Sequence, residues 1–336
     1  MNEPRPQSGR LSAKNPLRLK RYADRPPLAL EPHRVKEHKE HYVETRSFTT
    51  CFDEFKEEIS DLEMIRDRGH LVYVHGAHGT GKTSLICRCA YYLKELPTQA
   101  EVCVVDARSL VGPTGTPQRR MLGLALRICW ELLASQHFRD DQNRKQQVQN
   151  VISDIERLKA DRSLTPDTIR TEISTMLFEI DLASVRDGPL VVVILPRSSN
   201  LADVCFYADV VQPCMLFFTE IQDEDLDEGE PPFHGNISVI QLRTRSLEVE
   251  DGWAFIQQRL SGKMDGQESW KIQADDIKRI MTAYEGRMTI RMLVDGLVDL
   301  FEQIIGTDSS RDVSYSDLES QFIVARGSRE RAPHDR

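Results

Sequence analysis

The sequence predicts an α/β fold in which a five-stranded parallel sheet with flanking helices is followed by a helical lid domain. Three observations predict it. Short apolar runs alternate with helical segments over the first two thirds of the chain. A glycine-rich loop stands between the first such run and a helical pattern, in YVHGAHGTGKTSLICRCA at 73–90. From Ser246 onwards the pattern is helical.

Five segments are expected to form the strands. The run GPLVVVILP is the most continuous apolar stretch, and its β-branched residues between Gly and Pro are typical of a central parallel strand. AEVCVVDA has its Asp, Asp106, only 24 residues after Lys82, so we place this strand at the edge of the sheet. The strands in chain order are 70–76, 100–107, 188–196, 214–221 and 237–244.

Helices are expected between and after these strands. Apolar side chains at helical spacing predict one amphipathic helix over 52–65, and Thr165 followed by Pro166 is typical of an N-cap and first helical residue. Three lid helices follow, and Ser316-x-x-Glu319 predicts a capping box for a last one. The remaining helices are expected at 83–96, 119–135, 142–160, 249–260, 274–286 and 290–305.

Charge and composition suggest four parts: a flexible basic arm (1–35), a nucleotide-binding core (36–245), a helical lid domain (246–325) and a flexible tail (326–336). Residues 1–36 hold nine basic and three acidic side chains, a local net of +6 against −9 for the chain. We expect a solvated arm, with contact to nucleic acid or to an acidic partner as the alternative. The seven scattered cysteines, the absence of a membrane-length apolar run and an N-terminus unlike a secretory signal favour a cytoplasmic protein.

The glycine-rich loop has the spacing G-x-x-x-x-G-K-[ST], which defines a P-loop NTPase site. Its glycines let successive backbone N–H groups converge on phosphate oxygens at the positive end of a helix. We expect Lys82 to reach the β- and γ-phosphates of ATP and the Thr83 hydroxyl to bind Mg²⁺. The residues expected to bind the nucleotide are Gly76, Ala77, His78, Gly79, Thr80, Gly81, Lys82, Thr83 and Ser84.

Hydrolysis also needs a carboxylate that holds Mg²⁺ and, in many ATPases, a glutamate that activates water. Leu195 and Pro196 stand where this acidic pair is expected. Two acids of the chain could replace this pair: Asp106, at the end of the second strand, and Glu220, which we expect just beyond the fourth. A partner subunit is a third possible source of the acid. The acidic stretch 220–230 is expected to be a solvated loop.

Two further groups are candidates for sensing the nucleotide. Thr219 at the tip of MLFFT either senses the γ-phosphate or ends its strand. Arg287 and Arg291 lie one helical turn apart in the lid, where they either close over the phosphates or are exposed surface residues. The candidate catalytic residues are therefore Lys82, Thr219 and Arg291.

These segments resemble the AAA+ ATPases of the origin-recognition type and the related bacterial STAND and transposition-helper ATPases, with a degenerate Walker B strand. The resemblance covers about residues 12–325 and lies in NPL, GAHGTGKTS, FFTE, LRTRSLEVEDGWAFIQQRL and YEGRMTIRMLVDGL. It implies a five-stranded core, a helical lid, ATP with Mg²⁺, and assembly with protein partners, often into rings or filaments. It also implies that Thr219 is a sensor; the usual place of the lid arginine is taken by Thr289, with Arg291 two residues later.

Two functions follow as hypotheses. The first is a regulatory protein whose nucleotide state controls a partner or its own assembly, with slow or absent hydrolysis. The alternative is an active ATPase that acts as a DNA-associated helper, such as a transposition or replication loader. Expected partners are another protein or further copies of this chain, with DNA as a weaker candidate and no membrane.

Overall fold

The computed structural model describes residues 29–60, 62–97, 101–109, 117–180, 188–226, 237–261, 270–284, 286–306 and 312–324, together with Asn15, Leu17 and Leu182. The chain divides into two compact units. The core unit comprises 29–42 and 46–245. The C-terminal unit comprises 246–336, the short segment 43–45 and residues 1–28. Of the basic arm expected over 1–35, residues 29–35 are described and belong to the core unit, and Asn15 and Leu17 are also described. The rest of the arm and the expected tail (326–336) lie outside the described residues.

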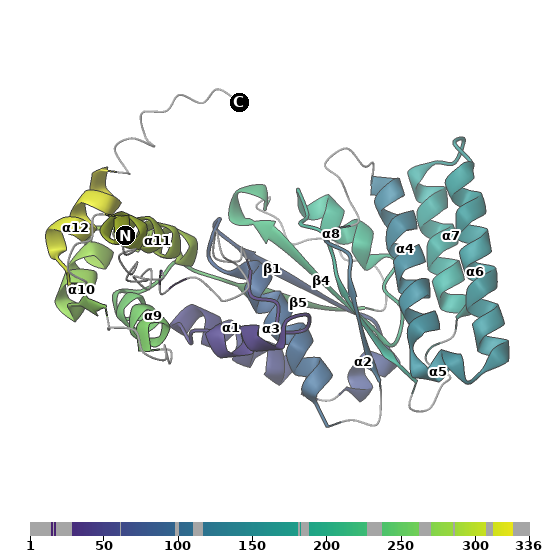
Figure 1. Ribbon diagram of the computed structural model, residues 1–336. Coiled ribbons are helices and arrows are strands. Elements are labelled where there is room, and N and C mark those ends of the chain that lie inside the picture. Colours follow the sequence, from purple (N-terminus) through teal and green to yellow (C-terminus); the bar gives the residue numbers. More distant parts are fainter. Residues whose placement is uncertain are drawn as a thin grey trace, which may run out of the picture. The chain divides into compact units, whose positions relative to one another are not determined.

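The core unit contains a five-stranded sheet in the order β2-β3-β4-β1-β5, and every neighbouring pair is parallel (Figure 1). Its central strands β1, β3 and β4 are apolar and almost entirely buried, which explains why their sequences read as continuous apolar runs. The predicted fold class is confirmed, and so is the edge position of β2. The strands are β1 (His70–Gly76), β2 (Val102–Asp106), β3 (Leu190–Ile194), β4 (Met215–Gln222) and β5 (Ser238–Arg243).

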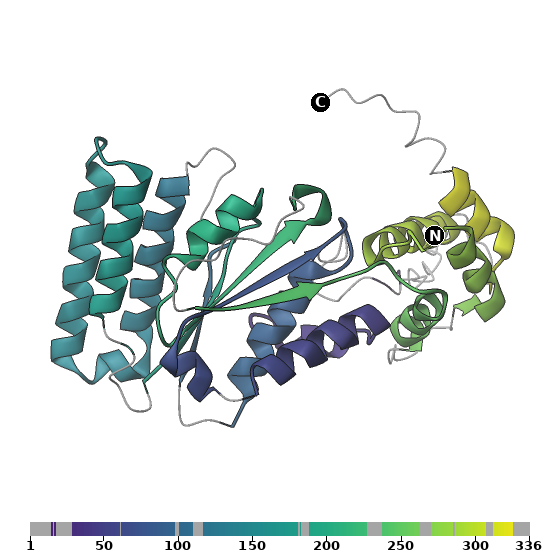
Figure 2. The same ribbon diagram turned by 180° about the vertical axis from the view of Figure 1, so that it is seen from behind.

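Helices cover both faces of this sheet, with α1 (Arg46–Glu58) and α3 (Lys82–Glu95) on one face and α8 (Leu201–Ala208) on the other (Figures 1 and 2). Phe55 of α1 packs on Phe218 of β4 with ring centroids 5.6 Å apart. The single helix expected over 52–65 is wrong. The chain instead forms α1 and a short α2 (Glu63–Asp67), because Ile59 and Ile65 are both buried across a break that preserves the apolar spacing.

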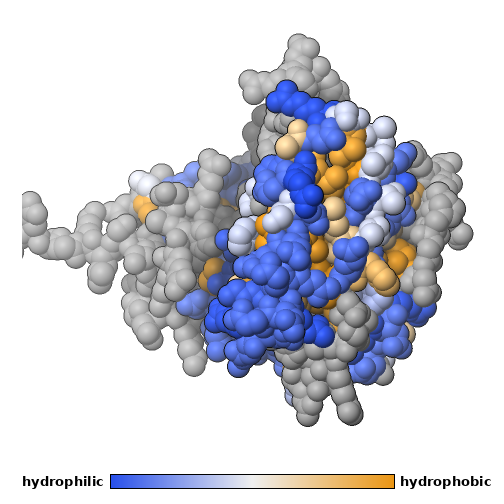
Figure 3. Space-filling model, turned by 90° about the vertical axis from the view of Figure 1, so that its right-hand side faces the viewer, coloured by the Kyte–Doolittle hydropathy of each residue, from blue (hydrophilic) through white to orange (hydrophobic). Residues whose placement is uncertain are grey.

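Three long helices form a layer beside the β2 edge: α4 (Pro117–Ala134), α6 (Gln142–Ala160) and α7 (Pro166–Glu179). A one-turn helix, α5 (Gln136–Arg139), joins α4 to α6, and a 3₁₀ turn (Lys36–His41) precedes α1. The predicted cap of α7 is confirmed, since the Thr165 side chain accepts from the Thr168 N–H and Pro166 follows it. Figure 3 shows that this side of the molecule is mostly hydrophilic with a band of apolar side chains.

The C-terminal unit packs three helices, α9 (Val249–Ser261), α10 (Ala274–Ala283) and α11 (Ile290–Gly306), around one apolar core. It also contains two two-residue strands, β6 (Lys271–Ile272) and β7 (Asp312–Val313), that the sequence did not predict. The capping box of α12 (Tyr315–Glu319) belongs to Ser314 and Asp317, so the expected Ser316–Glu319 box is wrong. A π-helical turn (Ser320–Val324) follows. Within the described residues, none of the helices combines the length and apolar character needed to span a bilayer.

Candidate nucleotide-binding site

The glycine-rich loop connects the end of β1 to the start of α3, as the P-loop motif predicts. Gly79 and Gly81 have φ values of 81° and 94°, a backbone region that residues with a Cβ atom rarely adopt. A Cβ on Gly76 would stand 2.3 Å from Thr244 Oγ1 and 2.5 Å from Thr244 O. The loop therefore curls tightly over the N-terminus of α3, where unpaired N–H groups and the helix dipole favour an anion.

Lys82 lies inside this curl. Its side chain is only 6% exposed, and Nζ donates to the main-chain oxygens of Gly76 (2.7 Å) and Ala77 (2.8 Å). Burial lowers the pKa of Lys82, and the nearby Glu220 carboxylate opposes that effect. Because both hydrogen-bond acceptors are neutral carbonyls, the buried cation is placed where phosphate oxygens would be better partners.

The loop is tied to the end of β5 through two threonines. Thr80 Oγ1 donates to Ala77 O (2.9 Å) and lies 2.7 Å from Thr244 Oγ1, and Thr244 also donates through N and Oγ1 to His75 O. No local pattern in the sequence indicates a role for Thr244, because the approach of β5 to the loop depends on the β1–β5 register. Thr244 thus helps to fix the loop.

The histidines near the glycine-rich loop and Ser84 differ in their contacts within the protein. His75 lies 2.8 Å from Asp223 Oδ1 and 2.9 Å from Gln241 Nε2, while His78 is exposed. Ser84 Oγ accepts from the Leu30 N–H at 3.1 Å, so its hydroxyl joins α3 to the segment before α1. Roles of His78 and Ser84 in nucleotide binding remain predictions.

The Thr83 hydroxyl donates to Glu220 Oε2 at 2.5 Å. Glu220 lies inside β4, not beyond it, because β4 continues to Gln222 and pairs there with Gly76 of β1. The acidic stretch from 220 is therefore not simply a loop: its first three residues belong to the strand, and Asp223–Asp225 form a 3₁₀ turn. Residues 227–230 lie outside the described part of the chain.

The β3 end carries no carboxylate at the expected positions, since Leu195 is buried and Pro196 follows it. Thr219 is fully buried within β4, so it does not end the strand. Its hydroxyl lies 2.8 Å from Ser198 Oγ and donates to Pro196 O at 3.2 Å. These contacts hold the segment after β3 against β4, and the sensor role of Thr219 remains a prediction.

Asp106 lies at the outer edge of the sheet, away from the loop. β3 and β4 separate β2 from β1, so the two strands stand about 14 Å apart. Arg108 donates to both oxygens of Asp106, at 2.9 and 2.6 Å. Burial alone would raise the pKa of Asp106, but the hydrogen bonds from Arg108 and the proximity of His33, whose Nε2 lies 3.7 Å from Asp106 Oδ2, outweigh it and leave the pKa well below its usual value. Asp106 is therefore not placed to serve as the magnesium acid.

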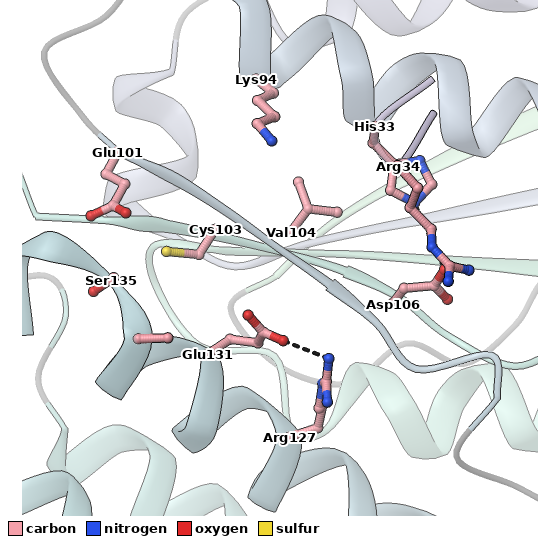
Figure 4. Close-up of a pocket in the computed structure, with 11 residues that line it drawn as sticks. His33, Arg34, Lys94, Glu101, Cys103, Val104, Asp106, Arg127, Glu131 and Ser135 are labelled. Carbon is pink, nitrogen blue, oxygen red and sulfur yellow. Dashed lines mark ion pairs between the residues drawn. The ribbon is translucent and has the colours of Figure 1, made fainter. Parts of the chain in front are cut away.

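Figure 4 shows Asp106 on the wall of a hollow along β2, where it faces Arg34. The hollow has a volume of about 320 Å³ and is also lined by side chains from the ends of α3 and α4. Its mixed charges include the Arg127–Glu131 ion pair at 2.7 Å. This hollow is separate from the glycine-rich loop.

The lid arginines belong to the C-terminal unit. Arg291 Nε donates to Asp295 Oδ2 at 2.6 Å, a pairing within α11. Arg287 lies in the non-helical segment before α11, so the expected spacing of one helical turn between the two arginines is wrong. Roles for these arginines at the nucleotide remain predictions. Among the described residues, no group of three or more His, Cys, Asp or Glu side chains could hold a metal without a ligand's help.

The core unit therefore brings together a glycine cradle, a buried ammonium and a hydroxyl–carboxylate pair. These groups fit a triphosphate with Mg²⁺: the amides and Lys82 suit phosphate oxygens, and the oxygens of Thr83 and Glu220 are the hard ligands that Mg²⁺ prefers.

No protein-family model matches this sequence, and no curated protein matches it. Among solved structures, the ORC2 protein of Aeropyrum pernix in ADPNP and ADP complexes superposes with a TM-score of 0.50 at 12% identity, covering 88% of this chain and 71% of that chain. Cdc6p of Pyrobaculum aerophilum gives a TM-score of 0.49 at 13% identity, covering 83% and 68%. Drosophila ORC bound to DNA gives 0.49 at 14% identity, covering 99% and 73%. The sheet with its flanking helices matches the ORC/Cdc6 AAA+ fold, and at these identities the likeness concerns the fold alone.

Proposed function

We propose that this chain is an ATP-binding regulatory protein of AAA+ type, in which the nucleotide state controls a partner or the chain's own assembly. Intrinsic hydrolysis is slow or absent. The observation that carries the proposal is the buried Lys82 ammonium in a glycine cradle, where its hydrogen-bond acceptors among the described residues are the neutral carbonyls of Gly76 and Ala77. The ADPNP and ADP complexes of the Aeropyrum pernix protein that shares the fold support the choice of ligand.

Different groups of the loop would contact different parts of the nucleotide. Backbone N–H groups around Gly79 and Gly81 would bind the phosphates, and the Lys82 ammonium would exchange a carbonyl acceptor for a phosphate oxygen. The Thr83 hydroxyl would be a ligand of Mg²⁺, which neutralises phosphate charge when bound. Tight binding follows because the cation and amides are already fixed before the ligand arrives.

Slow hydrolysis follows from the end of β3. A water molecule needs a positioned base to attack a phosphorus atom efficiently. Leu195 and Pro196 offer none, and the Thr219 hydroxyl beside them is engaged with Ser198 and Pro196. The cradle therefore holds ATP for longer than it takes an efficient ATPase to split it, which suits a switch.

Calorimetry with ATP and Mg²⁺ tests the binding. We expect saturable heat for the wild type and a loss of affinity of about 10- to 150-fold in Lys82→Ala, since a charge-assisted hydrogen bond contributes about 1.5–3 kcal/mol. Lys94→Ala is the matched control, because Lys94 is exposed at the opposite end of the same helix. Absence of binding heat in the wild type would contradict the proposal.

Turnover separates the two candidate functions. A phosphate-release assay on the isolated chain should give far less than one event per second, whereas typical enzymes reach about 1–1,000 per second. Turnover at several per second would instead favour the active ATPase. Assembly with a protein partner or further copies, and contact with DNA, stay predictions from the sequence.

A further inference from the structure

The sheet register explains how an acid can reach the nucleotide site although β3 lacks one. β4 lies between β3 and β1, so it is nearer to the glycine-rich loop than β3 is. Ile194 of β3 pairs with Phe218 of β4, and two residues further along Pro196 stands level with Glu220. The carboxylate that is missing at 196 is therefore present on the neighbouring strand at the same level.

Side-chain alternation directs this carboxylate towards the loop. Adjacent residues of a strand point to opposite faces of the sheet. Thr219 points to the side of Ser198, whereas Glu220 points to the start of α3 and accepts from the Thr83 hydroxyl at 2.5 Å. Glu220 is also the strongest favourable charge acting on the Lys82 ammonium. One half-buried carboxylate thus serves both side chains that define the P-loop motif.

Of the three acids that follow β4, two form ion pairs with other residues and the third is exposed. Asp223 is bound to His75 at 2.8 Å, and Asp225 is bound to Arg197 at 2.9 Å. Glu224 is exposed on the same turn. Among the described residues, Glu220 is consequently the acid in hydrogen-bond contact with Thr83.

We propose that Glu220 is the magnesium-facing carboxylate of this site, moved from β3 to β4. This inference rests on the proposed function, because it concerns the metal that accompanies ATP. The hydroxyl proton of Thr83 is held by Glu220, which leaves the oxygen lone pairs of Thr83 free for a cation. Mg²⁺ is bound in proteins through one or two carboxylates together with phosphate oxygens and water, and this pair matches that requirement.

A consequence separates binding from hydrolysis. If Glu220 serves the metal, it is not available as a base for water, and position 196 is a proline. The site then binds ATP in a strongly Mg²⁺-dependent way while hydrolysing it slowly. Nucleotide affinity with and without the metal is therefore the sharpest measurement.

The experiment compares the full chain with Glu220→Gln by calorimetry, titrating ATP in excess Mg²⁺ and in EDTA. The amide keeps an oxygen to accept from Thr83, so the fold is preserved, and thermal unfolding checks this. We expect the wild type to bind at least about tenfold more tightly with Mg²⁺, and Glu220→Gln to reduce that ratio to about threefold or less. Affinity in EDTA should be unchanged or higher, because a negative charge near the phosphates has been removed.

Glu224→Gln is the matched control: it makes the same change four residues away, at an exposed position outside the cradle, and should keep the wild-type ratio. Thr83→Val tests the other half of the pair and should also lower the ratio. With Mn²⁺ in place of Mg²⁺, the electron paramagnetic resonance spectrum of the nucleotide complex should change in Glu220→Gln and not in Glu224→Gln.

If Glu220→Gln keeps the ratio of affinities with and without Mg²⁺ that the wild type shows, the inference is overturned. The proposed function stays intact in that case, provided that Lys82→Ala still weakens ATP binding. A wild type that does not bind ATP would overturn the proposed function itself. The two failures are thus distinguishable.

Discussion

Replacing Gly76 by Ala should destabilise the core unit strongly, whereas the same replacement at Gly123 should stabilise it. Gly76 has a φ of 150°, and an added Cβ would meet Thr244 Oγ1 at 2.3 Å and Thr244 O at 2.5 Å. Gly123 lies in the interior of α4, and nothing stands within 4 Å of its added Cβ. The two variants add one methyl group each and differ only in surroundings.

The expected magnitudes follow from these distances. Overpacking costs about 1–3 kcal/mol and a residue held at an unfavourable φ costs about 1–3 kcal/mol, so Gly76→Ala should lower the free energy of unfolding by about 2–6 kcal/mol. A helical Gly→Ala change without a clash should raise it by about 0.5–1 kcal/mol. The main-chain oxygen of Thr244 cannot be removed by mutation, so Thr244→Ala should rescue Gly76→Ala only in part.

Urea unfolding followed by far-ultraviolet circular dichroism measures the difference. With a urea dependence of about 3 kcal/mol per molar, a loss of 4 kcal/mol moves the midpoint down by about 1.3 M. ATP affinity should fall in Gly76→Ala as well, because Gly76 O is an acceptor for Lys82. Equal midpoints for Gly76→Ala and Gly123→Ala would refute the reasoning, since it rests on a clash that Gly76 has and Gly123 lacks.

Three further predictions concern groups outside the loop. The pKa of Asp106 is lower in the folded state, so its ion pair with Arg108 stabilises the fold fully above about pH 4, and this contribution is lost as the pH falls from there through the folded-state pKa. Below about pH 4, Asp106→Asn should therefore make the free energy of unfolding less dependent on pH, as acid unfolding curves would show. Burial raises the pKa of Cys87 to about 12, so thiol reagents at pH 8 should label it only on unfolding, and fast native labelling would contradict this. The buried amide of Asn15 donates to Val298 O at 3.0 Å, so Asn15→Ala should cost about 1–3 kcal/mol by calorimetric unfolding of the C-terminal unit, and Asn15→Asp should not restore it because a carboxylate cannot donate.

The sequence predicts the sheet well because strands that are buried on both faces need apolar residues along their whole length. Runs such as 190–194 are apolar and β-branched over the length of one strand, and the loop after 76 fixes where the first strand ends. The order of the strands in the sheet is predicted only in part, through the edge position of β2. The pairing of Glu220 with Val74 depends on the strand register, which no local pattern encodes.

Local patterns also fail to locate a helix terminus where two neighbouring positions fit the same capping motif. Ser314-x-x-Asp317 and Ser316-x-x-Glu319 both fit a helix cap, and pairing of Val313 with Ile272 selects the first. An apolar periodicity continues through 59–65 although the helix is interrupted, because periodicity reports burial and not backbone continuity. The Thr83–Glu220 contact, which joins residues 137 apart, lies beyond such patterns altogether.

The hydrogen bond from Asn15 to Val298 spans 283 residues and joins the two ends of the C-terminal unit. At about 5–20 residues per second, a ribosome needs roughly 15–60 s to deliver the second partner after the first. Leu17, which is buried in the same core, can reach its packing partners from 247 onwards only after a similar delay. During synthesis the core unit can complete its sheet while this early segment stays unpaired, and a chaperone that shields short apolar stretches would have its longest opportunity there.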